Sequence, residues 1–316
     1  MKSKAILKNI IGCIVTLVLT ISLVQFTGHI LDPDESEEGF DAIEAFDLLE
    51  DNSLDVIVYG SSHAWKGCDT RVMCDKYGLK AYNYGCNWQA INTILLFLKD
   101  SLRTQSPKVI CVETGLIYHV EQDVDLDGEI YYTKKMPNFD GKREYLKQCF
   151  GDDVGRYISY YVPLAMFHEN WSKVNFENFW FPGPKRYVES RGYNICTGVN
   201  PFEIPDYTTM PQKDIPKDSK SVLEEIVKVC KENNINLILY TCPYAGDYPY
   251  SDALDEFAKE NGCTYLNLFK YVDDMGLDAQ IDMQDNMHLN ETGSGKVAAF
   301  LAEYIIDNYQ VENKAR

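Results

Sequence analysis

Short apolar runs alternate with amphipathic stretches over most of the chain. Five runs rich in β-branched and aromatic residues have the length of strands, at 56–59, 81–84, 109–113, 237–241 and 264–268. Helical periodicity falls between or after these runs, at 89–101, 219–232, 252–260 and 292–309, with Asn290 or Thr292 as the cap of the last helix. Strand–helix alternation of this kind predicts a three-layer α/β/α fold with a central, mainly parallel, flavodoxin-like sheet.

The longest apolar run lies near the N-terminus, from Ile10 to Phe26, and it contains no charged residue. With the weakly polar residues 27–30 it reaches about 20 residues, enough to cross a bilayer core as a helix. Lysines precede this run and acidic residues follow it: Lys2, Lys4 and Lys8, then Asp32, Asp34, Glu35, Glu37 and Glu38. Residues 1–31 are therefore expected to form a cytoplasmic N-terminus and a single-pass membrane anchor, with the rest of the chain outside. A cleaved signal peptide is the alternative, but no clear small-x-small cleavage site follows the run.

Three further parts are expected beyond the anchor. Residues 32–53 read as an acidic stalk that ends in a short helix near 42–50, and residues 54–316 form the main domain. Within that domain the segment 116–217 is far longer than a crossover helix requires, and it is rich in aromatic residues. Two interpretations stay open for this insertion: a cap over the mouth of the sheet, or a surface elaboration with its own small core.

The acidic composition restricts the partners of the chain. The 316 residues contain 48 Asp and Glu against 30 Lys and Arg, a formal net charge of −18. Because phosphate contacts require Lys and Arg, a nucleic acid is not an expected partner. The ten cysteines include no CxxC pair, which gives no support to a zinc ribbon or a thioredoxin-type site. An external location permits disulfides, but the spacing does not show how they would pair.

One stretch resembles a metal-binding loop. Residues Asp123 to Gly128 match the first half of a calcium-binding loop. However, Lys134 occupies the place of the bidentate acidic residue. An acidic surface turn is the favoured interpretation, and a weak external calcium site is the alternative. We expect neither a metal nor a cofactor in the functional site.

Residues that carry chemistry stand where the strands end. The segments 60–63, 84–87 and 113–115 each follow a strand, and sites in open parallel sheets form at the carboxyl ends of the strands. Asp285 and His288 lie in the loop before the last helix and can reach the same edge of the sheet. The sequence therefore predicts that these segments gather in one place.

A serine, a base and a carboxylate are available at this edge. The hydroxyl of Ser62 is a poor nucleophile unless a base takes its proton, and the imidazole of His288 titrates near neutrality. Asp285 can bond the other ring nitrogen and stabilise the imidazolium. The backbone N–H groups of Ser62 and Gly85 are the expected donors to an oxyanion, since Gly85 has no side chain to prevent close approach.

These motifs resemble the SGNH (GDSL-like) hydrolase superfamily. Gly60-Ser61-Ser62 stands where that family has Gly-Asp-Ser, Gly85 where it has its second-block glycine, and residues 285–288 where it has Asp-x-x-His. The resemblance implies Ser62 as nucleophile, His288 as base and Asp285 as the acid. An N-terminal anchor before an external domain is similar to the D-alanyl-lipoteichoic-acid transfer proteins and related envelope proteins that handle acyl groups. That similarity implies a membrane-bound O-acyltransferase as a partner.

The sequence departs from the family pattern at the third block. The usual Gly-x-Asn-Asp is absent, and Glu113-Thr114-Gly115 stands in its place. A Glu carboxylate beside an oxyanion would repel it unless turned away or protonated, and Asn87 or Thr114 are the alternatives for the missing donor. His63 either lines the pocket and binds substrate or is only a turn residue.

The expected function is that of an extracytoplasmic serine esterase or O-acyltransferase. It would act on an acylated envelope glycan or polymer, with acetyl as the expected acyl group. Water as the second acceptor gives an esterase, and a sugar hydroxyl gives a transferase. The alternative is a catalytically inactive envelope protein that has the same fold and binds glycan or a partner protein.

Overall fold

The computed structural model describes residues 2–31, 41–118, 130–174, 179, 185–309 and 311. The chain forms two compact units. One comprises residues 1–37 and 146–183, and the other comprises residues 38–145 and 184–316. The predicted insertion 116–217 is thus divided between the two units.

The larger unit is built on a five-stranded parallel sheet in the order β2-β1-β3-β4-β5. Its strands are β1 (Val56–Tyr59), β2 (Ala81–Asn83), β3 (Val109–Glu113), β4 (Asn236–Thr241) and β5 (Thr264–Asn267). Each boundary lies within one residue of the prediction. This order is that of flavodoxin-like sheets, so the predicted fold class is confirmed.

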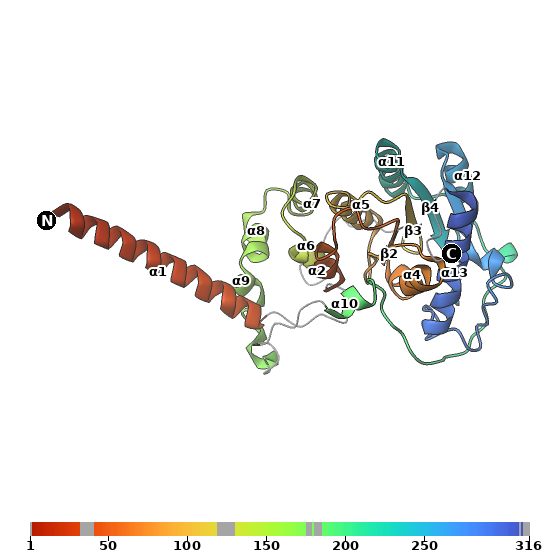
Figure 1. The fold of residues 1–316 in the computed structure, drawn as a ribbon, viewed down its shortest axis with the longest axis horizontal. Coiled ribbons are helices and arrows are strands. Elements are labelled where there is room, and N and C mark those ends of the chain that lie inside the picture. The colour runs from red at the N-terminus through yellow and green to blue at the C-terminus, as the bar shows by residue number, and fades with distance from the viewer. Residues whose placement is uncertain are drawn as a thin grey trace. The chain divides into compact units, whose positions relative to one another are not determined.

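Helices cover both faces of this sheet (Figure 1). α4 and α13 pack together on one face, and α5 and α11 pack together on the other. The helices of this unit are α2 (Asp41–Asp47), α3 (Ser62–Trp65), α4 (Thr70–Tyr77), α5 (Ile91–Ser101), α6 (Ile130–Lys135), α10 (Lys185–Glu189), α11 (Lys217–Glu232), α12 (Ser251–Asn261) and α13 (Glu291–Asn308). Asn290 caps α13 by accepting bonds from the N–H groups of Thr292 and Gly293, both at 3.1 Å.

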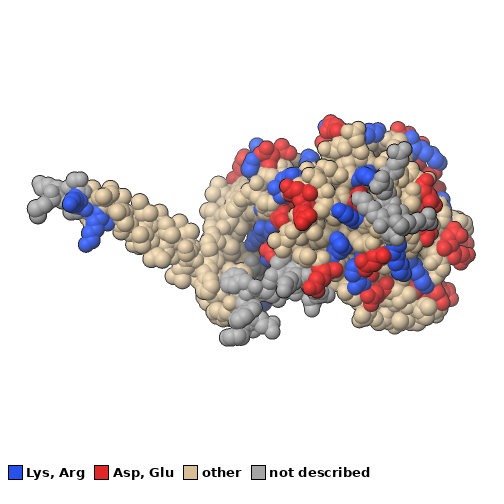
Figure 2. All heavy atoms as spheres, in the orientation of Figure 1, with Lys and Arg blue, Asp and Glu red and all other residues tan. Residues whose placement is uncertain are grey.

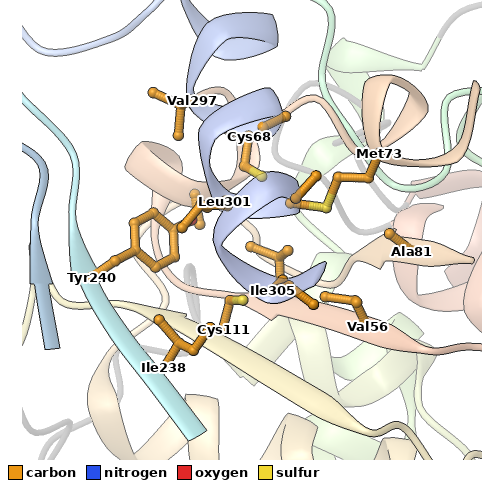
Figure 3. Packing of buried hydrophobic residues seen from close by; sticks show 14 of the residues in the cluster. Val56, Cys68, Met73, Ala81, Cys111, Ile238, Tyr240, Val297, Leu301 and Ile305 are labelled. Carbon is orange, nitrogen blue, oxygen red and sulfur yellow. The ribbon is translucent and has the colours of Figure 1, made fainter. Parts of the chain in front are cut away.

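One hydrophobic core lies between α13, α4 and the sheet. Figure 3 shows Leu301 and Ile305 of α13 facing Val56, Cys111 and Ile238 of three neighbouring strands. All five side chains are fully buried. Because both faces of a parallel sheet are covered, its strands are continuous apolar runs, which is why the sequence marks them clearly.

The smaller unit contains the long N-terminal helix α1 (Lys2–Leu31) with α8 (Val154–Tyr161), α9 (Pro163–Phe167) and the 3₁₀ helix η2 (Asn170–Lys173). Helix α7 (Asp140–Phe150) connects the two units in sequence. The last turn of α1 packs on α9, where a Cβ on Gly28 would lie only 2.4 Å from the backbone nitrogen of Leu164. This part of the aromatic-rich insertion therefore has a small core of its own together with α1.

None of the ten cysteines, all of which lie in the described part of the chain, forms a disulfide. The calcium-like residues Asp123 to Gly128 lie outside the described part of the chain, as do residues 32–40 of the expected acidic stalk. Both interpretations of the calcium-like loop therefore stay predictions.

We predict that Leu301→Ala lowers the free energy of unfolding by about 2–5 kcal/mol, because it leaves a cavity where α13 meets the sheet. The matched control is Leu48→Ala, since Leu48 is 66% exposed, and its effect should stay below about 0.5 kcal/mol. Urea unfolding followed by circular dichroism measures both variants. Equal effects would contradict the role assigned to this core.

Candidate active site

The site begins at the sharp turn that follows β1. Gly60 has a φ of +142°, and a Cβ at this position would lie 2.7 Å from the Cβ of Glu113 and 2.9 Å from that of Ala64. Only glycine fits such a turn without strain. The chain then enters α3, with Ser61 as its N-cap and Ser62 as its first residue. The turn thus sets Ser62 at the carboxyl end of a central strand.

The structure brings Ser62 together with His288 and Asp285. The hydroxyl of Ser62 lies 2.8 Å from Nε2 of His288, although the two residues are 226 positions apart. On the other side of the ring, Nδ1 of His288 lies 2.9 and 3.0 Å from the two carboxylate oxygens of Asp285. With the Nδ1 proton donated to Asp285, Nε2 is free to accept the Ser62 proton.

Asp285 also orders the loop that carries the histidine. Its Oδ1 accepts bonds from the N–H groups of Met287 at 2.7 Å and His288 at 2.8 Å. Burial raises the pKa of Asp285, but its bonds to the His288 ring and to these backbone groups outweigh burial and leave the pKa below its usual value. The carboxylate is therefore ionised at neutral pH.

His288 is a neutral base at neutral pH. Burial lowers the pKa of its imidazole, and the positive charge of Lys66 lowers it further, while the bond to Asp285 acts in the opposite direction. The pKa stays below its usual value of 6.5. Most His288 side chains are thus ready to accept a proton from Ser62.

The site lies at the position where ligands bind in folds of this class. Strands β1 and β3 are neighbours in the sheet, and the chain passes from β1 outward to β2 before it returns to β3. This is the point where the strand order reverses, outside the carboxyl ends of the strands. Gly60 follows β1 directly and Glu113 ends β3, so both border this point.

Two buried amides tie β2 and the loop after it to the turn at Gly60 and to the segment around α3. Gln89 accepts a bond from the N–H of Gly60 at 2.9 Å and donates one to the carbonyl of Tyr84 at 3.2 Å. Asn83 donates to the carbonyls of Ala64 at 2.8 Å and Cys68 at 2.9 Å. Neither residue was predicted to belong to the site. In the sequence, Asn83 is marked only as an amide at the end of a strand, and Gln89 only as an amide that soon follows it.

The N–H groups of Ser62 and Gly85, the two predicted oxyanion donors, have different hydrogen-bonding surroundings. Ser62 begins α3, and its N–H has no hydrogen-bond partner within the described residues, as an oxyanion donor requires. The N–H of Gly85 instead donates to Oδ1 of Asn83 at 3.0 Å. Gly85 could serve as the second donor only if that bond were shared or released, so its role stays a prediction.

The two alternative donors fare differently. Thr114 donates its N–H to the carbonyl of Tyr240 at 2.9 Å, and its hydroxyl lies 3.1 Å from the same carbonyl and 2.8 Å from Oγ1 of Thr241. Both donors of Thr114 are thus engaged at the end of β4, and its role stays a prediction. Asn87 is partly buried in the turn after β2, and its role stays a prediction.

His63 packs behind the base. Its ring centroid lies 5.6 Å from that of His288 and 5.1 Å from that of Tyr244, and its Nδ1 lies 3.4 Å from the Ser61 hydroxyl. Burial and the neighbouring His288 lower the pKa of His63 to about 4. With 7% of its surface exposed, His63 is placed to support the His288 ring, and a role in substrate binding stays a prediction.

Glu113 is turned away from solvent. Its Oε1 accepts bonds from the N–H groups of Gly115 at 3.0 Å and Cys242 at 3.4 Å. Burial raises the pKa of Glu113 to about 7. The carboxyl is therefore protonated in an appreciable fraction of molecules near neutral pH. A protonated Glu113 would repel a nearby oxyanion less than an ionised one would.

Among the residues the structure describes, no group of three or more His, Cys, Asp or Glu side chains is arranged to hold a metal ion.

Comparisons with known proteins give distant similarities only. No family model and no curated protein matches the chain. A crystal structure from Bacteroides fragilis, assigned as an acylhydrolase, is 12% identical to this chain. The match covers 84% of this chain and 94% of that one, with a TM-score of 0.39. A GDSL-like lipase from Bacteroides thetaiotaomicron is 13% identical, with coverages of 81% and 89% and a TM-score of 0.37. The name GDSL-like is that of the family that the sequence motifs resemble. Similarity this distant establishes no activity for this chain.

We predict that the acidic limb of the pH profile of kcat/KM has its midpoint below pH 6.5, because the lowered pKa keeps His288 deprotonated to that point. Lys66→Gln removes a positive charge that opposes the imidazolium, so it should move the limb to higher pH. Lys80→Gln, an exposed lysine just before β2, is the control and should not move it. Rates with a soluble aryl ester measure the profile, and a midpoint at or above pH 6.5 would contradict the assignment.

We predict that Glu113→Gln stabilises the protein more at pH 8 than at pH 5. An unfolded Glu ionises near pH 4.5 and folded Glu113 only near 7, so wild-type stability falls as pH rises through this window, by about 3 kcal/mol in all. The amide cannot ionise and escapes this loss. His63 has the opposite slope, losing stability as pH falls from 6.5 to 4, but it is common to both proteins and cancels in their difference.

Denaturant unfolding of Glu113→Gln and wild type at the two pH values measures this effect. Glu144→Gln, on the exposed side of α7, is the control and should show no such pH-dependent difference. A Glu113→Gln difference that is the same at pH 5 and pH 8 would show that the carboxyl is already ionised in the folded protein.

Proposed function

We propose that this chain is a membrane-anchored, extracytoplasmic serine esterase or O-acyltransferase. Its substrate would be an acylated envelope glycan or polymer, with acetyl as the acyl group. The observation that supports this best is the continuous line of hydrogen bonds from Ser62 through His288 to Asp285. A line of this kind, with a neutral imidazole between a serine and a carboxylate, is the arrangement that activates a serine for acyl transfer.

In the proposed reaction Ser62 attacks the ester carbonyl while its proton passes to Nε2 of His288. The tetrahedral intermediate carries a negative oxygen, which the N–H of Ser62 stabilises. The intermediate collapses when the C–O bond to the leaving alcohol breaks, and His288 returns the proton to that oxygen. The acyl group is left on Ser62.

A second acceptor completes the reaction. His288 removes a proton from water or from a sugar hydroxyl, whose oxygen attacks the acyl-serine carbonyl. The bond to Oγ of Ser62 breaks, and the serine regains its proton from His288. Asp285 stays ionised throughout and stabilises each imidazolium. Water as acceptor releases an acid, and a sugar hydroxyl yields a new ester.

The proposed anchor is supported by α1. Residues Ile6–Leu31 form a helix long and apolar enough to cross a membrane, and none of its most apolar window is buried in the protein. Figure 2 shows this helix as an uncharged surface with basic residues near its start. An apolar helix exposed on all sides is typical of a membrane span. A membrane-bound O-acyltransferase is a proposed partner, supported only by the resemblance to envelope acylation systems.

The charge of the chain bears on the proposed substrate. A net charge of −18 disfavours a polymer that carries a phosphate on every unit, because such a polymer would be repelled. Neutral glycan esters therefore fit the chain better than phosphate-rich polymers.

We predict that Ser62→Ala lowers ester cleavage or acyl transfer by roughly 10⁴-fold or more, because no other group supplies the nucleophile. A serine-directed fluorophosphonate probe should label the wild type and miss this variant. Ser61→Ala is the matched control: the Ser61 hydroxyl is buried and lies near His63 rather than His288, so labelling should persist.

The same pair of variants separates the enzyme from the alternative. If polymer acylation in cells and cleavage of soluble esters are both unchanged by Ser62→Ala, the enzyme proposal fails. A non-catalytic protein that binds glycan or a partner then becomes the better interpretation.

A further inference from the structure

The smaller unit contains, besides the apolar span of α1, another feature that points to lipid. From Ile6 to Phe26 the side chains of α1 are exposed, apart from the half-buried Val24, and burial begins at Gly28. About 20 helical residues cross a bilayer core. Counted from Ile10, where the uncharged run begins, this length ends near His29. The last turn of α1 would therefore emerge at the outer surface of the membrane.

Three contacts hold neighbouring segments against this emerging end. Gln25 donates a hydrogen bond to the carbonyl of Tyr161, at the end of α8, at 3.4 Å. Asn170 of η2 donates to the carbonyl of Leu31 at 3.3 Å. Gly28 meets the start of α9 without room for a side chain. The short helices are thus fixed at the level where α1 would leave the hydrocarbon.

Helix α8 has an apolar face that is about half exposed or more, although the ring of Tyr161 also meets that of Tyr160 edge-on. Val154, Ile158 and Tyr161 are 67%, 52% and 48% exposed. Their spacing of four and three residues places them on one face of the helix. Tyr157 and Tyr160, on other positions of the same helix, pack edge-on against Phe150.

Two further observations give this face the character of an interfacial surface. Trp171 lies in η2 beside the end of α1 and is 62% exposed. Between Val154 and Phe167 the sequence contains one charged residue, Arg156, whose guanidinium donates to the carbonyl of Cys149 at 3.2 Å. Tyrosine and tryptophan are enriched at the boundary between lipid headgroups and water.

We propose that α8 and η2 lie in the outer membrane interface, with Val154, Ile158, Tyr161 and Trp171 inserted at the boundary between headgroups and acyl chains. The occupant of this face is the lipid surface, because the face is continuous with the end of the helix that would span the same bilayer. The inference rests on the proposed membrane anchor and is independent of the Ser62 chemistry. Insertion of this face would give the anchor a second contact with the membrane, in addition to the span of α1. That contact would restrain the tilt and rotation of the smaller unit.

Tryptophan fluorescence tests this placement in the full chain reconstituted into phosphatidylcholine vesicles. The four tryptophans are at 65, 88, 171 and 180, so none lies in α1. In a Trp180→Phe background, lipids brominated near the headgroup should quench the emission of Trp171. Adding Trp171→Phe should remove most of this quenching. Adding Trp88→Phe should preserve it, since Trp88 is exposed in the other unit.

A charge on the proposed face should weaken the insertion. Val154→Asp with Ile158→Asp should reduce the quenching of Trp171, while Val199→Asp should not. Val199 is the matched control because it is a similarly exposed valine, at 57%, in the sheet-bearing unit. Equal quenching in all three proteins would overturn the proposal.

Extraction with alkaline carbonate distinguishes the failure of the anchor from the failure of this inference. A protein that carbonate releases from the vesicles has no membrane span, and both proposals then fall. A protein that is retained, but whose Trp171 is no more quenched than Trp88, keeps its anchor and overturns only the interfacial placement. In neither case is the result of the Ser62→Ala test affected.

Discussion

The site depends on the backbone turn at Gly60. Strand β1 ends at Tyr59 and helix α3 begins at Ser62, so the chain must change direction within two residues. Gly60 makes this change possible with a φ of +142°. The Cβ atoms of Glu113 and Ala64 fill the space on either side, so any larger residue would push the start of α3 away. The contact of 2.8 Å between Ser62 and His288 could not survive such a shift.

The same turn is fastened by an amide rather than by packing alone. Gln89 is fully buried and binds the N–H of Gly60, while its own N–H group binds the carbonyl of Tyr84. An unpaired N–H in this place would be costly, because no water reaches it. The loops after two neighbouring strands therefore hold each other, and the nucleophile sits on a rigid support.

Much of this arrangement could be predicted from the sequence, and the reasons are particular. The strands are buried on both faces, so they appear as unbroken runs such as 109–113. Ser62 and His288 could be paired because parallel topology brings the residue after a strand and the loop before the last helix to one edge. Helices α3 and α4 were not predicted, since four and eight residues are too few to show a clear period.

The oxyanion donors could not be predicted in the same way. Whether the N–H of Gly85 is free depends on the side chain two residues earlier, and Asn83, which is buried at the end of β2, accepts from it. Thr114 was a plausible donor by its position alone. Its hydroxyl instead meets the end of β4, a strand that lies more than a hundred residues further along the chain. Contacts of this kind follow from tertiary packing, and no local pattern encodes them.

The electrostatic surroundings of His288 favour the release of a proton from its imidazolium over the uptake of a proton by its imidazole. Burial and Lys66 make the imidazole a weaker base than a free histidine, which makes its imidazolium a stronger acid. His63 stays neutral beside it and so does not repel the imidazolium further. An ester of a sugar hydroxyl has a poor leaving group that must be protonated as it departs, so a more acidic imidazolium helps where the chemistry is hardest. The ionised Asp285 acts in the opposite direction, because its bond to Nδ1 favours the imidazolium that forms when His288 takes a proton.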